Sequence, residues 1–249
     1  MNALALNTRL LNCSPSNTSS DLAEAGLVVA LKAEYRAAAL TGLPAVCLGV
    51  GPERARRAAQ ALIHKGARAL VSFGVAGGLR PELAPGTLLL PSELHWRGAF
   101  FHTDEKLYSW LSRIAGTCLS TVCAPHVAVD EMVMDVRAKA RLASAHGAAG
   151  VDMESGGVAE AANAAAVPFA IVRSVCDDAG TSLSPRVAEL LNGNGELRLL
   201  HAAAAVLRRP ALMSELISLG ADFKQALDTL RCMAQALRAD LNTRGEDNS

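Results

Sequence analysis

The sequence of 249 residues is poor in aromatic side chains, at 4%, and it carries no net charge, because 24 basic residues balance 24 acidic ones. A neutral chain lacks the long-range field that draws proteins to polyanions, so we do not expect nucleic acid as a partner. No uninterrupted apolar run approaches the ~20 residues that a membrane-spanning helix requires. The composition therefore argues against nucleic-acid-binding and transmembrane proteins.

Motifs of several common site types are also missing. The six cysteines form neither C-x-x-C pairs nor a dense framework, so we expect a reducing, cytoplasmic compartment. His95 and His102 share one segment, but no H-E-x-x-H or comparable ligand spacing accompanies them, and we expect no metal site. No G-x-S-x-G sequence supports a serine hydrolase.

The chain is long enough for one α/β domain, and its 51% hydrophobic content suits a sheet covered by alanine-rich helices. Residues 1–24 have no basic segment before their leucines and continue into a Ser-rich stretch, so we expect a loose arm and not a signal peptide. The domain is expected over residues 25–240, followed by a polar tail at 241–249.

Hydrophobic periodicity places the secondary structure. Strands are expected at residues 26–31, 45–50, 68–71, 87–90, 119–124, 150–151 and 169–175. One helix is expected to begin at Pro52 and to end at Gly66, a second to cover 155–166, and the chain to be helical from Gly195 onward. This alternation predicts a single α/β domain with a largely parallel, twisted central sheet flanked by helices and a helical C-terminal region.

Two acidic segments fall at the ends of expected strands. Val151-Asp152-Met153-Glu154-Ser155 opens the alanine-rich helix, and Asp177-Asp178 follows the β-branched run after Pro168. Ligands of open α/β sheets bind at the carboxyl ends of the strands, so we expect Glu154 and Asp177 to converge on one crevice. Each residue alone could instead be a carboxylate stabilised by local amides.

Two further segments add to this pattern. Ser72-Phe73-Gly74-Val75-Ala76-Gly77-Gly78-Leu79 follows an expected strand, and we expect a loop whose backbone approaches a ligand closely. Leu27-Val28-Val29-Ala30-Leu31 is a hydrophobic strand that ends in a charged turn bearing Glu34.

In order and spacing across residues 26–180, these four blocks resemble the nucleoside phosphorylase and nucleosidase family, which includes methylthioadenosine/S-adenosylhomocysteine nucleosidase. The segments 127–155 and 206–210 look most like its hopanoid-associated branch, often called adenosylhopane nucleosidase or phosphorylase. The resemblance implies a homodimeric enzyme without a cofactor that releases adenine from an adenine nucleoside. It also implies a cytoplasmic protein that can lie at the membrane surface where a lipid-linked substrate resides.

The resemblance assigns roles to particular residues. Breaking an N-glycosidic bond leaves positive charge on the sugar and negative charge on the base, so an acid is needed at the base and acceptors at the sugar. Asp177 would give a proton to purine N7, and Glu154 would accept hydrogen bonds from the ribose hydroxyls. Met153 would pack on the ribose, and Glu34 would position and deprotonate the attacking water.

Further substrate contacts are assigned in the same way. Val133 and Met132 fall where the family contacts adenine, although Met132 replaces the usual phenylalanine. Gly74, Val75 and Ala76 match the substrate-binding part of the glycine-rich segment, and Val75 replaces a small polar residue of the nucleosidases.

The attacking nucleophile is left open between water and phosphate. Phosphorylases clamp phosphate with an arginine just before the glycine-rich segment, whereas this chain has Val71-Ser72-Phe73 there. Loop amides together with Arg173 could hold phosphate, but the presence of Glu34 favours water. Arg173 also has a purely structural alternative, which is to neutralise nearby carboxylates.

Other functions remain as alternatives. The substrate could be methylthioadenosine, S-adenosylhomocysteine or another small purine nucleoside. Leu48-Gly49-Val50-Gly51-Pro52-Glu53-Arg54 begins like a dinucleotide-binding fingerprint of an NAD-dependent oxidoreductase, but Arg54 stands at the third glycine and a tight turn is the expected structure. The apolar C-terminal helices would also suit a non-catalytic protein of lipid surfaces.

Overall fold

The computed structural model describes residues 24–117, 119–182 and 211–246. The expected arm at 1–24 falls outside these ranges except for Glu24, as does the hopanoid-like segment at 206–210. Among the described residues, no helix is both long and apolar enough to span a bilayer.

The centre of the molecule is a ten-stranded sheet. Its longest strand, β3 (Ala69–Gly78), lies between β1 (Ala25–Val29) and β10 (Phe169–Asp177) and runs parallel to both. The other strands are β2 (Ala45–Cys47), β4 (Leu88–Leu89), β5 (Glu93–Trp96), β6 (Ala99–His102), β7 (Thr121–Val122), β8 (His126–Ala128) and β9 (Gly150–Asp152). Six of the nine strand pairs among the described residues are parallel, which confirms the predicted fold class.

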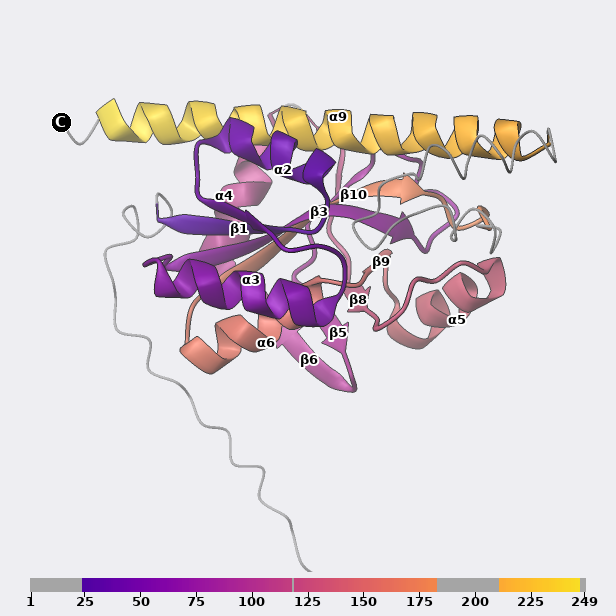
Figure 1. Ribbon diagram of the computed structural model, residues 1–249, viewed down its shortest axis with the longest axis horizontal. Helices are drawn as coiled ribbons and strands as arrows, with labels where there is room; N and C mark the ends of the chain where they lie inside the picture. The colour runs from indigo at the N-terminus through magenta and orange to yellow at the C-terminus, as the bar shows by residue number, and fades with distance from the viewer. Residues whose placement is uncertain (1–23, 118, 183–210, 247–249) are drawn as a thin grey trace, which may run out of the picture.

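Helices cover both faces of the sheet (Figure 1). The short α2 (Lys32–Ala38), which continues into a 3₁₀ turn at Ala39–Thr41, shares one face with α4 (Glu105–Ala115) and the long α9 (Ala211–Glu246). Helices α3 (Pro52–His64) and α6 (Ser155–Ala165) pack together on the other face. Helix α5 (Val136–His146) lies at one end of the molecule, beside β8 and β9.

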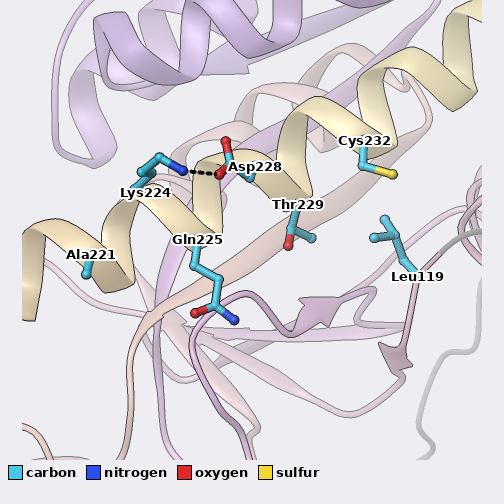
Figure 2. Close-up of a pocket in the computed structure, with 7 residues that line it drawn as sticks. All are labelled: Leu119, Ala221, Lys224, Gln225, Asp228, Thr229 and Cys232. Carbon is cyan, nitrogen blue, oxygen red and sulfur yellow. Dashed lines mark hydrogen bonds and ion pairs between the residues drawn. The ribbon is translucent and has the colours of Figure 1, made fainter.

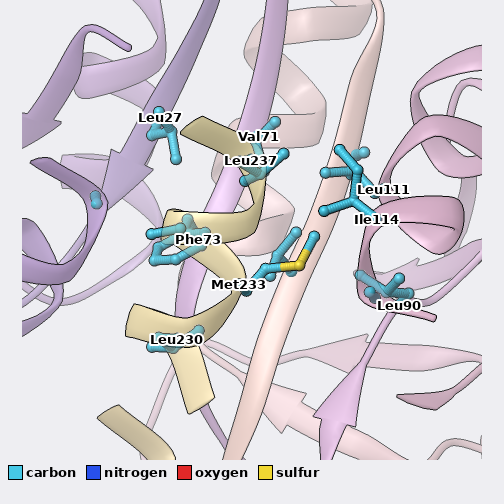
Figure 3. Close-up of a cluster of buried hydrophobic side chains, with 14 of the residues drawn as sticks. Leu27, Val71, Phe73, Leu90, Leu111, Ile114, Leu230, Met233 and Leu237 are labelled. Atoms are coloured by element: carbon cyan, nitrogen blue, oxygen red, sulfur yellow. The ribbon is translucent and has the colours of Figure 1, made fainter. Parts of the chain in front are cut away.

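Each face has its own hydrophobic core. Leu230, Met233 and Leu237 of α9 form one core with Phe73 of β3 and Leu111 of α4 (Figure 3). The second core joins α3 and α6 to the opposite face of β1, β3 and β10. The sheet is therefore buried on both sides, which explains why its central strands are almost continuously apolar.

Several sequence expectations are confirmed and others need correction. The helices at Pro52 and at 155–166 are present, and Gly66 follows the first of them with a φ of +94°. The sequence does not predict strands β5, β6 and β8, because each is only three or four residues long and too short to show a clear alternation. Of the predicted polar tail, residues 241–246 belong to helix α9.

The most consequential correction concerns the glycine-rich segment. The predicted loop at Ser72–Leu79 is wrong: residues through Gly78 continue strand β3 and pair with β10 along its length. Pairing with β10 through Gly77, and with β9 at Gly77 and Gly78, holds this backbone extended, so its glycines do not form a turn. Because Gly74 has no side chain, Glu34 and Arg173 can lie close to the strand at this position.

Candidate active site

Charged side chains gather where the carboxyl ends of β3 and β10 meet the first turns of α2 and α6. Glu34, Asp152, Glu154 and Arg173 are all at least 93% buried in this region. Asp177 lies four residues beyond Arg173 on β10 and is 8% exposed. Glu34 and Asp177 thus lie near the carboxyl ends of the parallel strands β1, β3 and β10, whereas Glu154 follows β9, which runs antiparallel to β3.

Glu34 lies in the first turn of α2, and not in an irregular turn as expected from the sequence. Its Oε2 accepts hydrogen bonds of 2.9 Å from the amides of Ala30 and Leu31, and its Oε1 accepts one of 2.8 Å from the amide of Val75. Burial raises the pKa of Glu34, although Arg173 and these amides oppose the shift. Because a carboxylate has about four acceptor positions, one remains for a further donor such as water.

Gly74 leaves room beside strand β3 for both Glu34 and Arg173. A Cβ atom at this position would lie 2.5 Å from Glu34 Oε1 and 2.6 Å from Arg173 Nη1. The glycine is therefore required by the close approach of two charged groups to the strand. This gives a structural reason for a glycine in the middle of a long strand.

Arg173 is 1% exposed, and its guanidinium contacts groups of the protein. Its Nη1 donates to the carbonyl of Val75 at 3.1 Å, and its Nη2 donates to the hydroxyls of Ser72 at 2.8 Å and Ser155 at 3.3 Å. Its Nε lies 2.8 Å from Asp152 Oδ2 in an ion pair. The ion pair with Asp152 is the kind of contact that the structural alternative for Arg173 describes, whereas its hydrogen bonds go to a carbonyl and two hydroxyls.

Asp152 was part of the quoted motif but was not assigned to the site. Its Oδ1 accepts from the amides of Glu154 and Ser155, and its Oδ2 contacts Arg173, the Ser155 hydroxyl and His126 Nε2. Burial alone would raise the pKa of Asp152, but Arg173 and His126 outweigh it and hold the pKa well below its usual range. Asp152 thus fixes Arg173 and the first turn of α6.

Glu154 occupies the N-cap position of α6. Its Oε1 accepts a 3.0 Å hydrogen bond from the amide of Gly51, and its Oε2 lies 3.7 Å from Arg173 Nη2. Burial raises the pKa of Glu154 to about 7, against the attraction of Arg173 and with help from the negative charges of Asp152 and Glu34. Gly51 belongs to the incomplete G-x-G segment, so this turn supports a carboxylate of the site.

Asp177 has a partner that the sequence analysis missed. Lys139 of α5 is 1% exposed, and its ammonium contacts Asp177 Oδ2 directly. The thiol of Cys176 donates to Asp177 Oδ1 at 3.1 Å. Leu142 and Ala143 follow Lys139 by three and four residues and pack in the hydrophobic cluster beside α5. Residues at this spacing share one face of a helix, and this was the signal in the sequence that Lys139 is buried.

The remaining predicted residues are placed less centrally. Val133 packs with Val151 in a small hydrophobic cluster. Gly77 lies between Val151 and Asp177: a Cβ atom on this glycine would be 3.2 Å from Val151 Cγ1 and 3.4 Å from Asp177 Oδ2. Met132 is 44% exposed. Ala76 is buried in β3 opposite Val175 of β10, and Met153, between β9 and α6, is half-buried.

A surface hollow elsewhere on the molecule is lined by other residues. Figure 2 shows it between α9 and Leu119, with the ion pair of Lys224 and Asp228 at 2.9 Å on its wall. None of the buried carboxylates lines it. Within the described ranges, no three His, Cys, Asp or Glu side chains are grouped so that they could hold a metal ion.

Comparison with known proteins gives a relative of similar sequence. An aminodeoxyfutalosine nucleosidase of Campylobacter jejuni is 32% identical over 150 residues, which cover 53% of this chain and 66% of that protein. The match therefore spans slightly less than two thirds of the relative's length.

Solved structures share the fold at lower identity. Futalosine hydrolase of Helicobacter pylori has a TM-score of 0.67 at 16% identity, covering 87% of this chain and 97% of that one. A 5′-methylthioadenosine/S-adenosylhomocysteine nucleosidase of Neisseria meningitidis, in complex with methylthio-immucillin-A, has a TM-score of 0.66 at 17% identity, covering 86% and 98%. The family model described as the phosphorylase superfamily matches residues 31–208, a range that contains every residue assigned to the site, and the chain belongs to this superfamily.

Proposed function

We propose that this protein is an N-ribosyl hydrolase that releases adenine from an adenine nucleoside. The observation that carries the proposal is the buried carboxylate of Glu34, held by three amides beside Glu154 and Arg173. A raised pKa brings a carboxyl group closer to the operating pH, where a general base works best. The names of the nucleosidases that the chain resembles support cleavage of a nucleoside.

In the proposed reaction, Glu34, Asp177 and Glu154 each act on a different part of the nucleoside. Water loses a proton to Glu34 and its oxygen bonds to C1′ of the ribose, while the C1′–N9 electron pair moves to the purine. Asp177 gives a proton to N7 of the departing base. Glu154 accepts hydrogen bonds from the ribose hydroxyls, so its negative charge also favours the cationic sugar of the transition state.

The charges of the site favour water over phosphate as the nucleophile. Glu34, Asp152 and Glu154 surround a single guanidinium, and the hydrogen bonds of Arg173 go to groups of the protein. A phosphate dianion entering this region would meet an excess of negative charge without a free cationic fork to bind it. We therefore propose hydrolysis and not phosphorolysis.

The proposed activity is tested by measuring free adenine after incubation with adenosine and with methylthioadenosine. Adenine release by the wild type, with at least ~10²-fold loss in Glu34→Gln, is the expected result. Glu53→Gln changes an exposed glutamate paired with Arg56 and Arg57 and serves as the matched control. Phosphate-dependent adenine release that survives in Glu34→Gln would contradict the assigned role of Glu34.

We further propose adenosylhopane as the substrate, on the resemblance to the hopanoid-associated branch. Helix α5 and the start of α9 lie toward the same end of the molecule (Figure 1), and an exposed apolar residue belongs to each region. Ile217 of α9 is 63% exposed and Met132, just before α5, is 44% exposed. These side chains would suit a bulky apolar 5′ group or the membrane surface that carries it.

A series of adenosine analogues with longer 5′ alkyl chains tests this substrate. Each buried CH₂ contributes roughly 0.8 kcal/mol, so kcat/KM is expected to rise along the series. If methylthioadenosine or adenosine is the better substrate below the aggregation limit of the analogues, the lipid substrate is wrong and a small-nucleoside nucleosidase remains.

A homodimer is also proposed. Phe100 on the β5–β6 hairpin packs edge-on against His95 but is still 63% exposed, and aromatic side chains are enriched in protein–protein interfaces. Light scattering is expected to give twice the mass of 25.9 kDa. A monomeric mass at micromolar concentration would contradict it.

A further inference from the structure

A lysine is one of the least expected residues in the interior of this molecule. Lys139 is 1% exposed, and its ammonium donates to Asp177 Oδ2, to the carbonyl of Asp178 at 2.6 Å and to the carbonyl of Thr181 at 3.1 Å. An ammonium group has three donors, and all three are used. Burying such a charge is costly unless it is paired and hydrogen-bonded, so this arrangement needs a reason.

The contacts join two parts of the site that are distant in sequence. Lys139 is on α5, which follows the segment of Val133, while its three acceptors are at the end of β10 and in the turn after it. Holding Asp177 Oδ2 restricts rotation of the carboxyl group. The other oxygen, Oδ1, has the weak thiol donor of Cys176 and is the one left to face a base.

We infer that Lys139 is a positioning residue for the proton transfer to the leaving base. The inference rests on the proposed function. During the reaction the O–H bond of the Asp177 carboxyl group breaks, an N–H bond forms at purine N7, and the O–H electron pair stays on the carboxylate. A hydronium ion from the solvent returns the proton to Asp177 before the next turnover. The ammonium of Lys139 neutralises that carboxylate in a buried site and keeps it aimed at the base.

The test compares two ribosides that differ in their need for an acid. Adenosine must have its base protonated, whereas p-nitrophenyl β-D-ribofuranoside has a leaving group that departs as an anion. Lys139→Met is expected to lower kcat for adenosine by at least ~10-fold more than kcat for the p-nitrophenyl riboside, with KM little changed, because acid assistance contributes roughly 10² to 10⁴. Lys139→Arg, which keeps the charge, is expected to recover part of the loss.

Two further variants separate this role from a structural one. Lys139→Gln keeps a hydrogen-bond donor without the charge, so it remains informative if Lys139→Met does not fold. Lys106→Met removes an exposed lysine of α4 and is the matched control. Equal losses on the two ribosides, or full activity of Lys139→Gln on adenosine, would overturn the inference, whereas a wild-type protein that cleaves neither riboside would overturn the proposed function itself.

Discussion

Asp152 and Glu154 are two residues apart and equally buried, yet their surroundings shift their pKa values in opposite directions. For Asp152, Arg173 and His126 outweigh burial and keep the pKa low. For Glu154, burial outweighs the more distant Arg173, and the pKa rises to about 7. Asp152 therefore stays ionised and holds Arg173, whereas ionisation of Glu154 lowers the stability of the folded protein.

This difference predicts a pH-dependent effect of Glu154→Gln on stability. The pKa of Glu154 in the folded protein is about 7 and exceeds the usual 4.5, so the folded protein favours the protonated carboxyl group. Its contribution to the free energy of unfolding is fully present below pH 4.5 and is lost as the pH rises through 7. The variant is expected to raise Tm at pH 8 by several degrees and to have little effect at pH 4.5. Thermal unfolding at both pH values measures this, and an equal change at both would show that ionisation of Glu154 is not the cause.

Asp177 is the proposed acid, and it is also the carboxylate that pairs with the buried ammonium of Lys139, so its replacement is expected to lower both turnover and stability. Asp177→Asn is expected to cut adenine release by ~10²-fold or more, because it removes the acid while keeping the shape of the side chain. Asp178→Asn, which changes a neighbour that bonds Gly180 and Thr181, is the control. Near wild-type turnover of purified Asp177→Asn would exclude it as the acid.

At the scale of elements, the site depends on how closely α3 and α6 approach. A Cβ atom on Gly157 of α6 would lie 2.0 Å from the carbonyl oxygen of Pro52, in the first turn of α3. This proximity lets the amide of Gly51 reach Glu154 at 3.0 Å. The two helix N-termini are thus fixed against each other at the sugar-binding carboxylate.

Gly157→Ala is expected to force these helices apart. Overpacking of this kind typically costs about 1–3 kcal/mol, and loss of the Gly51 contact should raise KM for the nucleoside. Gly220→Ala is the control, because a Cβ there meets nothing within 4 Å and alanine favours a helix by up to ~1 kcal/mol. Urea unfolding and KM are the measurements; unchanged values in Gly157→Ala would mean that the helices can adjust without cost.

Much of this arrangement was predictable from the sequence, and the exceptions have physical reasons. The strands β1, β3 and β10 are apolar runs, and their carboxyl ends carry Glu34, the Gly74 segment and Asp177, so the edge where they meet could be inferred. The loop predicted at Gly74 was wrong because glycine permits a turn but does not require one. The place of Lys139 on the apolar stripe of its helix could have indicated that it is buried, but the pattern does not identify Asp177, 38 residues further along the chain, as its partner.

At the scale of the whole molecule, α9 covers one face of the sheet without contributing a residue assigned to the site. Leu230 and Met233 are fully buried against that face, while Ile217 near the start of the helix is exposed (Figures 1 and 3). Helix α9 therefore stabilises the sheet through the hydrophobic core on one face, and it affects the carboxylates only through the stability of the sheet.

Leu230→Ala tests this separation of stability from chemistry. Truncating a fully buried leucine typically costs 2–5 kcal/mol, so the urea midpoint should fall clearly while kcat of the folded fraction stays within about twofold. Ile217→Ala, at an exposed position of the same helix, is expected to change stability by less than ~0.5 kcal/mol. A large loss of kcat in Leu230→Ala under native conditions would show that α9 acts on the site.

The central claim is that water attacks the ribose of an adenine nucleoside in a site rich in carboxylates. Its most direct test is to run the reaction in ¹⁸O-labelled water, with and without phosphate, and to analyse the sugar by mass spectrometry. We predict free adenine and a free sugar that carries one ¹⁸O atom before exchange, in the same yield with and without phosphate. A ribosyl 1-phosphate product, or adenine release that requires phosphate, would contradict the account.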